Sequence, residues 1–495
     1  MRERDQHFSS GNYPEDPTGV RCSQFVCFVI VAIPLAATLF TALKHWQRNK
    51  GGALSPESSK INYGKNTRNH VRLCFSRHCL ERLLQMLCLQ NTSKGVLSTA
   101  SSIPGGAYSS LYGIRVLSLL WIICGHLAKL TIQNSLETLK SNRLYVISYS
   151  GPVFLAVDTF LLMGGLLSAR TLLNFIKRAD GEMNATLVAR YLLNRIKRTQ
   201  PLNIFIMCLA IGLSSLFSLQ PHQFLGTGCK KYWWANVLLV NNLIGNHICI
   251  PWTWYISLDF QFYATTPLLL FFYKLNLRVF TVVSGALLLL TTTVGAVLPA
   301  LLQMPVFSPL PIEKKEVYYM YYYSSPFTRY GPFLIGIITG IYMTTKTDRL
   351  IKQRWQAAVG WFCSLSLMAL LVEMAYILKD TPSYPSIPHA LYQGLHRTLW
   401  TCAVSWIIVA CEEGYGGFIK SFLCCGIWIP LSNISLACYL IHPLLILLYN
   451  GAQVTPFIYT DLNFMYLFFG CVVSTVLISY LLTVLIERPY FFKLT

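Results

Sequence analysis

The sequence predicts an all-α polytopic membrane protein with about eleven transmembrane helices. Hydrophobic residues occupy 54% of its 495 positions and charged residues only 12%, whereas soluble globular domains carry about 25% charged residues. The apolar residues also gather into eleven runs, each near the ~20 residues that a helix needs to cross a bilayer. Composition and spacing together exclude an ordinary soluble domain.

The eleven runs divide into one N-terminal anchor and a bundle of ten. The first run is too long for the apolar part of a signal peptide. More basic residues follow this run than precede it, whereas a signal peptide has its basic residues in front. We therefore expect an uncleaved anchor. Two runs are less apolar than the others because they contain Asp158 and Asp259. The expected spans cover residues 22–43, 111–132, 149–174, 201–219, 252–273, 279–302, 326–345, 355–378, 393–411, 431–450 and 463–486.

Basic residues are distributed unequally between the loops and predict the orientation. Of the 40 Lys and Arg residues, 25 follow odd-numbered spans, 10 lie in the N-terminal tail and after even-numbered spans, and five lie within spans. Because cytosolic loops carry the excess of Lys and Arg, we expect a luminal or extracellular N-terminus and a cytosolic C-terminus. The net charge of +20 then needs no nucleic-acid partner. The endoplasmic reticulum and the plasma membrane are both open as locations.

These boundaries define four predicted regions. Residues 1–21 form a short luminal tail, 22–43 the anchor, 44–108 a basic cytosolic linker and 109–491 the main membrane domain. Within the linker, leucines at helical spacing with interleaved arginines predict an amphipathic helix at residues 71–90. Such a helix would lie on the membrane lipids.

Two of the 16 cysteines differ from the rest. Most cysteines lie in spans, where a small apolar residue is the simple interpretation. Cys229 and Cys249 bracket the one sizeable loop on the luminal side, where thiols can be oxidised. We expect a disulfide between them, with two free thiols as the alternative.

Arg115 and His126 lie inside the second span, where ionisable side chains are costly and mark functional sites. Eleven residues at about 100° each amount to about three turns plus 20°, so both side chains leave the same helix face. They are about 16 Å apart along the axis. This arrangement predicts that Arg115 binds an anionic group near one surface and that His126 performs proton chemistry deeper in the membrane.

Asp158, in the next span, needs a partner at membrane depth. An imidazole is one candidate, because a carboxylate that holds one ring N–H raises the basicity of the other nitrogen. We therefore predict that Asp158 orients His126. The alternative is a structural pair between Asp158 and an arginine elsewhere in the bundle. The nearby Gly164 and Gly165 permit close helix packing.

A further set of polar and aromatic residues lies within later spans or at their luminal ends. Its tryptophan and tyrosine are typical of an aromatic belt at the membrane interface, but a belt does not explain a carboxylate, an amide, a guanidinium and an imidazole. We therefore expect these residues to line an acceptor pocket: Trp254, Tyr255, Asp259, Gln261, Arg329 and His442.

Arg195 and Arg198 precede the fourth span in a basic amphipathic stretch and, being three residues apart, share a helix face. Contact with anionic lipids is one interpretation, and capture of a cofactor's phosphates at the cytosolic mouth is the other. No GxSxG, P-loop, HExxH or CxxC motif competes. We therefore expect neither a soluble catalytic site nor a bound metal.

Together these segments resemble the acyltransferase-3 type of membrane acyltransferase, more narrowly the "nose resistant to fluoxetine" branch and the vertebrate O-acyltransferase-like proteins. Where relatives often have Ser–Gly after the DTF element, this chain has Gly164–Gly165. The matching motifs are GIRVLSLLWIICGH (113–126), VDTFLLMGGLL (157–167), RIKRTQP (195–201), YWWANVLLVNN (232–242), WTWYISLDFQFY (252–263), SPFTRYGPFLIG (325–336), SLACYLIHP (435–443) and IERPY (486–490).

The resemblance implies a membrane-bound O-acyltransferase with acyl-CoA as co-substrate. Arg115 and His126 match the family's catalytic signature, and Arg195 and Arg198 match its cytosolic R-x-x-R-x-x-P element. The family's reaction implies an acyl-CoA donor on the cytosolic side, a hydroxyl acceptor, and His126 as general base. A carrier of lipids or hydrophobic small molecules without acyl transfer is the alternative. The acceptor, the acyl length and the oligomeric state are open.

Overall fold

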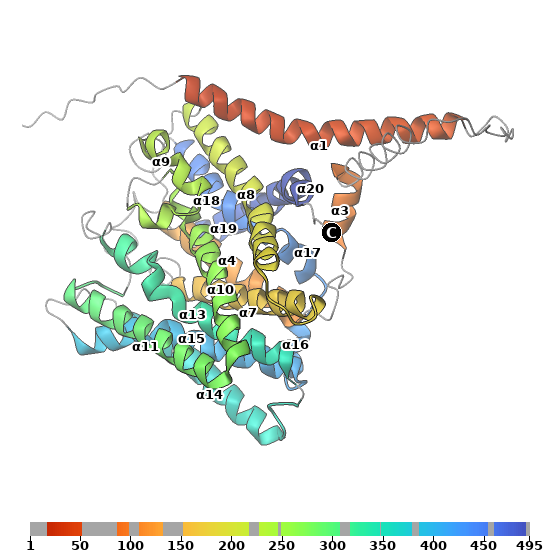
Figure 1. Ribbon diagram of the computed structural model, residues 1–495. Helices are drawn as coiled ribbons and strands as arrows, with labels where there is room; N and C mark the ends of the chain where they lie inside the picture. The colour runs from red at the N-terminus through yellow and green to blue at the C-terminus, as the bar shows by residue number, and fades with distance from the viewer. Residues whose placement is uncertain are drawn as a thin grey trace, which may run out of the picture.

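All regular secondary structure in the described part of the chain is helical (Figure 1). Residues 71–86 of the expected amphipathic helix, most of the predicted linker and residues 1–16 of the predicted tail lie outside the described residues. The computed structural model describes residues 17–51, 87–98, 108–131, 152–216, 227–245, 249–306, 317–346, 348–378, 386–453 and 460–491.

Each of the eleven predicted spans coincides with one long helix. In chain order these are α1 (Pro17–Gly51), α4 (Ser110–Thr131), α7 (Phe154–Arg178), α8 (Ala185–Leu216), α10 (Trp254–Leu275), α11 (Leu277–Leu301), α13 (Pro326–Thr345), α14 (Arg354–Ile377), α15 (Ile387–Glu412), α18 (Ser435–Gly451) and α19 (Asp461–Leu482). The shorter elements are α3 (Leu89–Leu97), α9 (Thr227–Val237), η2 (Asn241–Leu243), η3 (Pro251–Thr253), η4 (Tyr318–Tyr323), α16 (Gly417–Leu423), α17 (Trp428–Asn433), η5 (Thr483–Glu487) and α20 (Arg488–Tyr490).

The number of membrane spans is supported only in part. Among the described residues, six helices are long and apolar enough to cross a membrane, and a seventh candidate is the pair α15 and α16, which is bent by 94°. Four helices that coincide with predicted spans, α8, α10, α13 and α18, do not meet this test. The protein is therefore a polytopic membrane protein, and the count of eleven stays a prediction.

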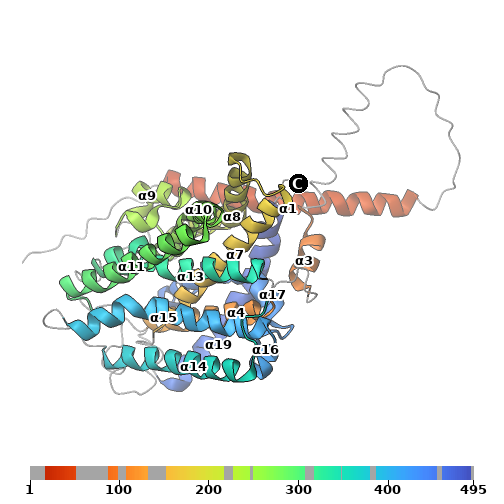
Figure 2. The same ribbon diagram turned by 60° about the horizontal axis from the view of Figure 1, so that its bottom comes forward.

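The centre of the bundle is a set of parallel helices, α7, α13 and α15. Glycines set the distance between α7 and α13, since a Cβ atom at Gly165 would collide with the carbonyl of Phe333, and one at Gly336 with that of Leu162. The expected close packing at Gly164–Gly165 is thus present at Gly165. Figure 2 shows α13 and α15 lying side by side, between α11 and α14.

Neighbouring helices run in the relative directions that successive membrane crossings require. α14 and α15 are antiparallel, because Ser364 donates to the carbonyl of Ala403 and Tyr392 donates to that of Leu371. The contacts between α1 and α8 are antiparallel as well, since Cys27 donates to Phe205 while Gly212, further along α8, faces the earlier residue 24.

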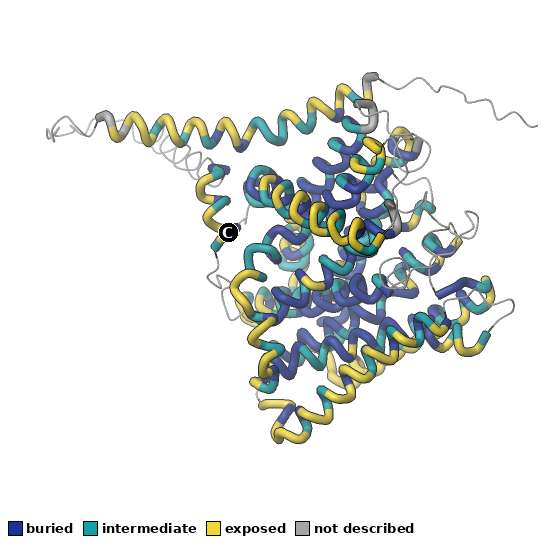
Figure 3. The backbone as a smooth tube through the Cα atoms, turned by 180° about the vertical axis from the view of Figure 1, so that it is seen from behind, coloured by how far each residue is buried: buried dark blue, intermediate teal, exposed yellow. Residues whose placement is uncertain are grey.

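Apolar side chains cover the outside of the bundle as well as its interior. α1, which runs along one side of the bundle and extends past it (Figure 1), has only 11% of its apolar window buried, and α11 and α14 have 17% each. Figure 3 shows the contrast between these exposed helices and the buried centre. Phe28, Val282 and Phe362 are each at least 70% exposed. Such a surface is suited to lipid, which solvates apolar side chains on the outside of a span.

Candidate functional site

His126 and His442 form a hydrogen-bonded pair between α4 and α18. Nδ1 of His126 lies 2.8 Å from Nε2 of His442, and the two rings stack with centroids 5.0 Å apart. Nδ1 of His442 lies 2.8 Å from the carbonyl oxygen of Cys438, one helical turn earlier. His442 is fully buried, whereas His126 is half-buried.

The chemistry of these bonds fixes both tautomers. A carbonyl oxygen only accepts, so Nδ1 of His442 carries the hydrogen, and Nε2 of the neutral ring is an acceptor. Nδ1 of His126 must then donate to it. The lone pair of His126 is therefore on Nε2, as a general base requires.

Asp158 has a different partner from the one predicted. Its Oδ1 accepts a hydrogen bond from Nη1 of Arg329 at 2.7 Å, and both side chains are fully buried. The position expected for Asp158, beside Nδ1 of His126, is occupied by His442. The predicted Asp158–His126 pair is wrong in the structure because a buried carboxylate needs a compensating positive charge. Arg329 supplies this charge, whereas a neutral imidazole does not.

Two aromatic rings enclose the guanidinium of Arg329. It lies 4.6 Å from the ring centre of Tyr323 and 5.1 Å from that of Trp254. Its Nε also donates to the backbone carbonyl of Tyr323. The two predicted acceptor-pocket residues Trp254 and Arg329 are therefore in contact, with Arg329 behind the half-buried face of Trp254.

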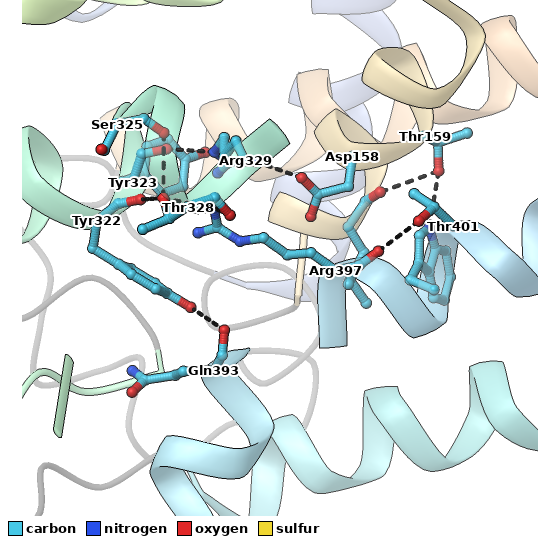
Figure 4. A network of polar contacts seen from close by, with 12 residues as sticks. Asp158, Thr159, Tyr322, Tyr323, Ser325, Thr328, Arg329, Gln393, Arg397 and Thr401 are labelled. Carbon is cyan, nitrogen blue, oxygen red and sulfur yellow. Dashed lines mark hydrogen bonds and ion pairs between the residues drawn. The ribbon is translucent and has the colours of Figure 1, made fainter. Parts of the chain in front are cut away.

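Arg397 on α15 lies near Arg329 and Asp158, and no role was predicted for it from the sequence. Its Nη1 donates to the carbonyl and hydroxyl of Thr328 at 3.1 and 3.2 Å, and its guanidinium stacks on Tyr322 at 4.5 Å. Figure 4 shows Arg329 pointing at Asp158, and the side chain of Arg397 passing Asp158 to end beside Thr328. An arginine inside an apolar span was the signal available, since the same cost singled out Arg115.

Three arginines form a second charged group, at the N-terminal end of α4. Nη1 of Arg115 donates to the hydroxyl of Ser432 at 3.4 Å, and its guanidinium interacts electrostatically with Arg195 and Arg198. Arg198 also interacts with Glu487. Cations brought together in this way are suited to binding a multiply charged anion such as a phosphate group. The structure thus brings together the arginines that the sequence singled out at two separate places.

Arg195 is also bonded to Asp259. Its Nε lies 3.1 Å from the Oδ2 of Asp259, and its Nη2 contacts the same oxygen. The sequence predicted Arg195 at a cofactor and Asp259 in a pocket near the opposite surface, and this predicted separation is wrong because the two side chains are bonded. The physical reason lies in η3, which leads into α10 from inside the bundle: there the indole of Trp252 donates to the carbonyl of Leu440 on α18.

An inward-folded segment, residues 227–245 and 249–253, produces this arrangement. A disulfide joins Cys229 and Cys249, whose Cα atoms are 4.0 Å apart. Inside it, the amides of Asn236 and Asn241 both donate to the hydroxyl of Thr253 at 2.7 and 2.8 Å. The aromatic-belt interpretation therefore does not hold for the end of this segment, which lies within the protein.

The side chain of Gln261 bonds to the inward-folded segment and does not line an open acceptor pocket as predicted. Its amide nitrogen donates to the carbonyl of Leu239 at 3.0 Å and to the side chain of Asn242 at 2.8 Å. These bonds use the polar groups that the sequence analysis expected to face an acceptor. The asparagines of a predicted loop gave no signal for such a network, because the partners are 12 to 22 positions apart and no local pattern joins them.

Tyr255 connects the arginine group to the histidine pair. It interacts electrostatically with Arg115 and Arg195, and its ring lies 5.5 Å from that of Tyr439. The ring of Tyr439 in turn lies 6.2 Å from that of His442. Tyr255 and Tyr439 are both half-buried, so a row of partly accessible aromatic faces extends between the two groups.

The described residues contain no group of three or more His, Cys, Asp or Glu side chains that could hold a metal ion. They do contain three arginines at one end, which favour an anion, and a neutral, basic imidazole further along. This arrangement can bind an anionic cofactor at the arginines and remove a proton at His126.

Comparisons with known proteins agree with the motifs. The profile of the acyltransferase-3 family, described as an acyltransferase domain, matches residues 108–484. Nose resistant to fluoxetine protein 6 of Caenorhabditis elegans is 28% identical over 388 residues, which cover 71% of this chain and 46% of that protein. Regulator of hypoxia-inducible factor 1, from the same organism, is 24% identical over 305 residues, covering 56% of this chain and 58% of that protein.

The chain thus spans about half the length of these curated relatives. No solved structure matches. The family profile, however, covers most of the chain without a break and includes both the arginine group and the histidine pair. The chain belongs to the acyltransferase-3 family.

Proposed function

We propose that this protein is a membrane-bound O-acyltransferase that moves an acyl group from cytosolic acyl-CoA to a hydroxyl acceptor at or across the membrane. The observation that supports this most directly is the relay from His126 through His442 to the Cys438 carbonyl. It holds one nitrogen of His126 as a donor and keeps the other basic. Membership of the acyltransferase-3 family agrees with such a role.

In the proposed reaction, Nε2 of His126 takes the hydroxyl proton while the acceptor oxygen attacks the thioester carbonyl carbon. The new C–O bond forms, the C–S bond breaks, and the proton passes from His126 to the departing thiolate, giving an ester and CoA. As His126 becomes a cation, its bond to His442 becomes charge-assisted and stronger. A positioned base contributes about 10²–10⁴ in rate.

The donor would bind by its phosphates to Arg115, Arg195 and Arg198. Asp259 already compensates Arg195, and Glu487 lies near Arg198 and Arg115. The net attraction therefore comes from the positive charge of the three arginines that these two carboxylates leave uncompensated. The axial offset of about 16 Å between Arg115 and His126 separates the charged part of the donor from its thioester. A long, flexible donor bound at one end and reactive at the other fits this separation.

The acceptor would lie against the half-buried faces of Trp254 and Tyr255, next to the histidine pair. In this proposal His442 positions His126 instead of lining the acceptor pocket, and Asp158 ties α7 to α13 instead of acting on His126. Asp259 and Gln261 shape the pocket indirectly, by holding Arg195 and the inward-folded segment.

Two observations support the proposed orientation, with a luminal N-terminus and a cytosolic C-terminus. The excess of basic residues in alternate loops predicts it. The disulfide between Cys229 and Cys249 agrees with it, because disulfides persist in oxidising compartments and this orientation places their loop on the luminal side. The arginine group is then on the cytosolic side, and His126 is closer to the lumen.

The test is acyl transfer by the purified full-length protein in lipid vesicles, with isotope-labelled acyl-CoA and a membrane lipid extract as the source of acceptors. We expect His126→Ala to lower labelled product by about 10²–10⁴. His45→Ala, which removes an exposed histidine on α1, is the matched control and should retain full activity. Wild-type turnover in His126→Ala, with normal protein levels, would refute the assignment.

The rival function is carriage of a lipid or hydrophobic small molecule without acyl transfer. Buried charges within spans and the bent pair α15–α16 favour it, because broken helices with intramembrane charges are typical of transporters. Movement of an unmodified ligand between vesicle compartments, without release of CoA, would support the carrier. Release of CoA together with an acylated product would support the enzyme.

A further inference from the structure

The buried charges around Asp158 do not balance within the described residues. Asp158 and Arg329 are fully buried, and Arg397 is 3% exposed. Arg329 is paired with Asp158, and Arg397 lies near the same carboxylate without bonding to it, so two guanidiniums accompany one carboxylate and the net charge is +1. A buried charge without compensation is strongly destabilising, so an excess of this kind needs an explanation.

Hydrogen bonding in this cluster is incomplete in the same way. Nη2 of Arg329 and Nε of Arg397 are buried donors without a partner among the described residues, and Oδ2 of Asp158 is a buried acceptor without one. Buried polar groups are nearly always paired in folded proteins. The two unpaired donors belong to the two cations, so the excess charge and these two donors call for the same addition, an anionic acceptor group, whereas Oδ2 of Asp158 still needs a donor.

The described residues that face the guanidiniums add no negative charge. Their rings belong to Trp254, Tyr322 and Tyr323, and a neutral tyrosine supplies only the partial charge of its π face. Arg329 is in the first turn of α13, and Asp158 lies one turn into α7. The positive ends of two helix dipoles therefore increase the positive potential.

The cluster lies next to the proposed reaction centre. Tyr323, whose ring stacks on Arg329, lies near Tyr439, and the ring of Tyr439 lies 6.2 Å from that of His442. Trp254, on the other side of Arg329, precedes Tyr255 in the row of aromatic faces. One layer of aromatic rings therefore separates the cations from the base.

We propose that Arg329 and Arg397 bind a carboxylate of the acceptor, so that the acceptor class is an amphiphile that bears both a hydroxyl and a carboxylate. The inference rests on the proposed function for the role of the hydroxyl. A single carboxylate matches an excess of one positive charge, and its planar pair of oxygens fits the donors of a guanidinium. The aromatic rings would hold the apolar body of the same molecule.

The first experiment measures binding to the purified full-length protein without acyl-CoA. The probes are ω-hydroxydodecanoate and its primary amide, which differ only in the charge of the head group. We expect the carboxylate to bind the wild type roughly ten- to a hundredfold more tightly, the range for a hydrogen bond to a charged group. Arg397→Gln should abolish this preference. Lys346→Gln, which removes a cation paired with Glu413, should retain it.

The second experiment compares the melting temperatures of ligand-free Arg397→Gln and Arg397→Lys. Both lose the guanidinium contacts, but only the lysine keeps the excess charge, so the glutamine variant should be the more stable. A less stable glutamine variant would mean that the charge is already compensated and would overturn the proposal. So would a wild-type preference below about twofold, or one that survives Arg397→Gln, because a charged hydrogen bond is worth more than that.

His126→Ala separates this inference from the proposed function. The variant should lose acyl transfer yet keep the preference for ω-hydroxydodecanoate over the amide, because the aromatic layer separates His126 from the arginines. A preserved preference in a wild-type protein that transfers no acyl group would support the carboxylate site and refute the enzyme. Transfer to neutral acceptors alone, with no preference for the carboxylate, would support the enzyme and overturn the carboxylate site.

Discussion

His442→Phe tests the relay most directly. Phenylalanine keeps a planar ring in the stacked position, 5.0 Å from His126, but removes the Nε2 acceptor. The bond at 2.8 Å between the two rings is then lost, and so is the preference for the tautomer that leaves Nε2 of His126 basic. The variant should therefore slow catalysis while the packing around α18 is largely retained.

The expected magnitude follows from the change in this bond during the reaction. With neutral His126 the bond is worth about 0.5–1.5 kcal/mol, and with the cationic ring about 1.5–3 kcal/mol. Only the difference of about 1–1.5 kcal/mol accelerates the reaction, because the remainder is present before it begins. This corresponds to a roughly five- to twelvefold fall in kcat, since about 1.4 kcal/mol is a factor of ten. The fall is far smaller than for His126→Ala.

The assay is steady-state acyl transfer with KM measured for acyl-CoA. We expect kcat to fall and KM to stay constant in His442→Phe, because the donor binds at the arginine group. His442→Gln, whose amide oxygen can accept from Nδ1 of His126, should recover part of the loss. The double variant with His126→Ala should be no slower than His126→Ala alone, as for residues that act as a unit. Wild-type kcat in His442→Phe, or full additivity in the double variant, would refute the relay.

Three further predictions concern binding and stability. Arg198→Gln should raise KM for acyl-CoA about tenfold or more with little change in kcat, because it removes a charged contact made before and during the reaction; steady-state kinetics would detect this. Asp158→Asn should destabilise the protein by about 3–5 kcal/mol, because it leaves the Arg329 cation buried without its partner; thermal melting would show this, and an unchanged melting temperature would contradict it. Glu413 lies in the turn after α15, where burial opposes ionisation but bonds from the backbone N–H groups of Ile351 and Leu350 outweigh it and lower the pKa of its carboxyl. Its contribution to stability should therefore be present at neutral pH and disappear as the pH falls through and below about 4.3, the unperturbed value for Glu; melting curves of wild type and Glu413→Gln should converge there.

Local properties of the sequence were enough to locate the helices. An apolar run near the thickness of a bilayer must satisfy its backbone hydrogen bonds internally, and a helix is the simplest way to do so. All eleven runs therefore coincide with helices, including the two that contain Asp158 and Asp259. Whether an aromatic residue lies at the membrane interface or inside the protein was harder to predict. Trp252 and Trp254 look like interface residues by type, yet the disulfide and the asparagine network of the inward-folded segment hold Trp252 inside the protein and leave Trp254 half-buried.

Pairing of charges could not be predicted from the same properties. The position of Asp158 in an apolar span indicates that it needs a partner. The sequence alone could not rank His126 against an arginine 171 positions away as that partner. Once the helices are packed, Asp158 pairs with Arg329 because the full positive charge of the guanidinium compensates the buried carboxylate, which outweighs one hydrogen bond to a neutral imidazole. Arg397 and His442 were visible as costly residues in apolar spans, but their roles depend on which helix each one faces.

The relation between α4 and its neighbours explains why the spacing of Arg115 and His126 is meaningful. The two residues are eleven positions apart, and their partners Ser432 and His442 are ten positions apart. Residues 432–442 therefore run parallel to α4 and contact it at both ends. The distance between the donor-binding end and the base is thus set by α4, which α17 contacts at Arg115 and α18 contacts at His126. A rigid spacing of this kind is what a donor bound at one end and reactive at the other requires.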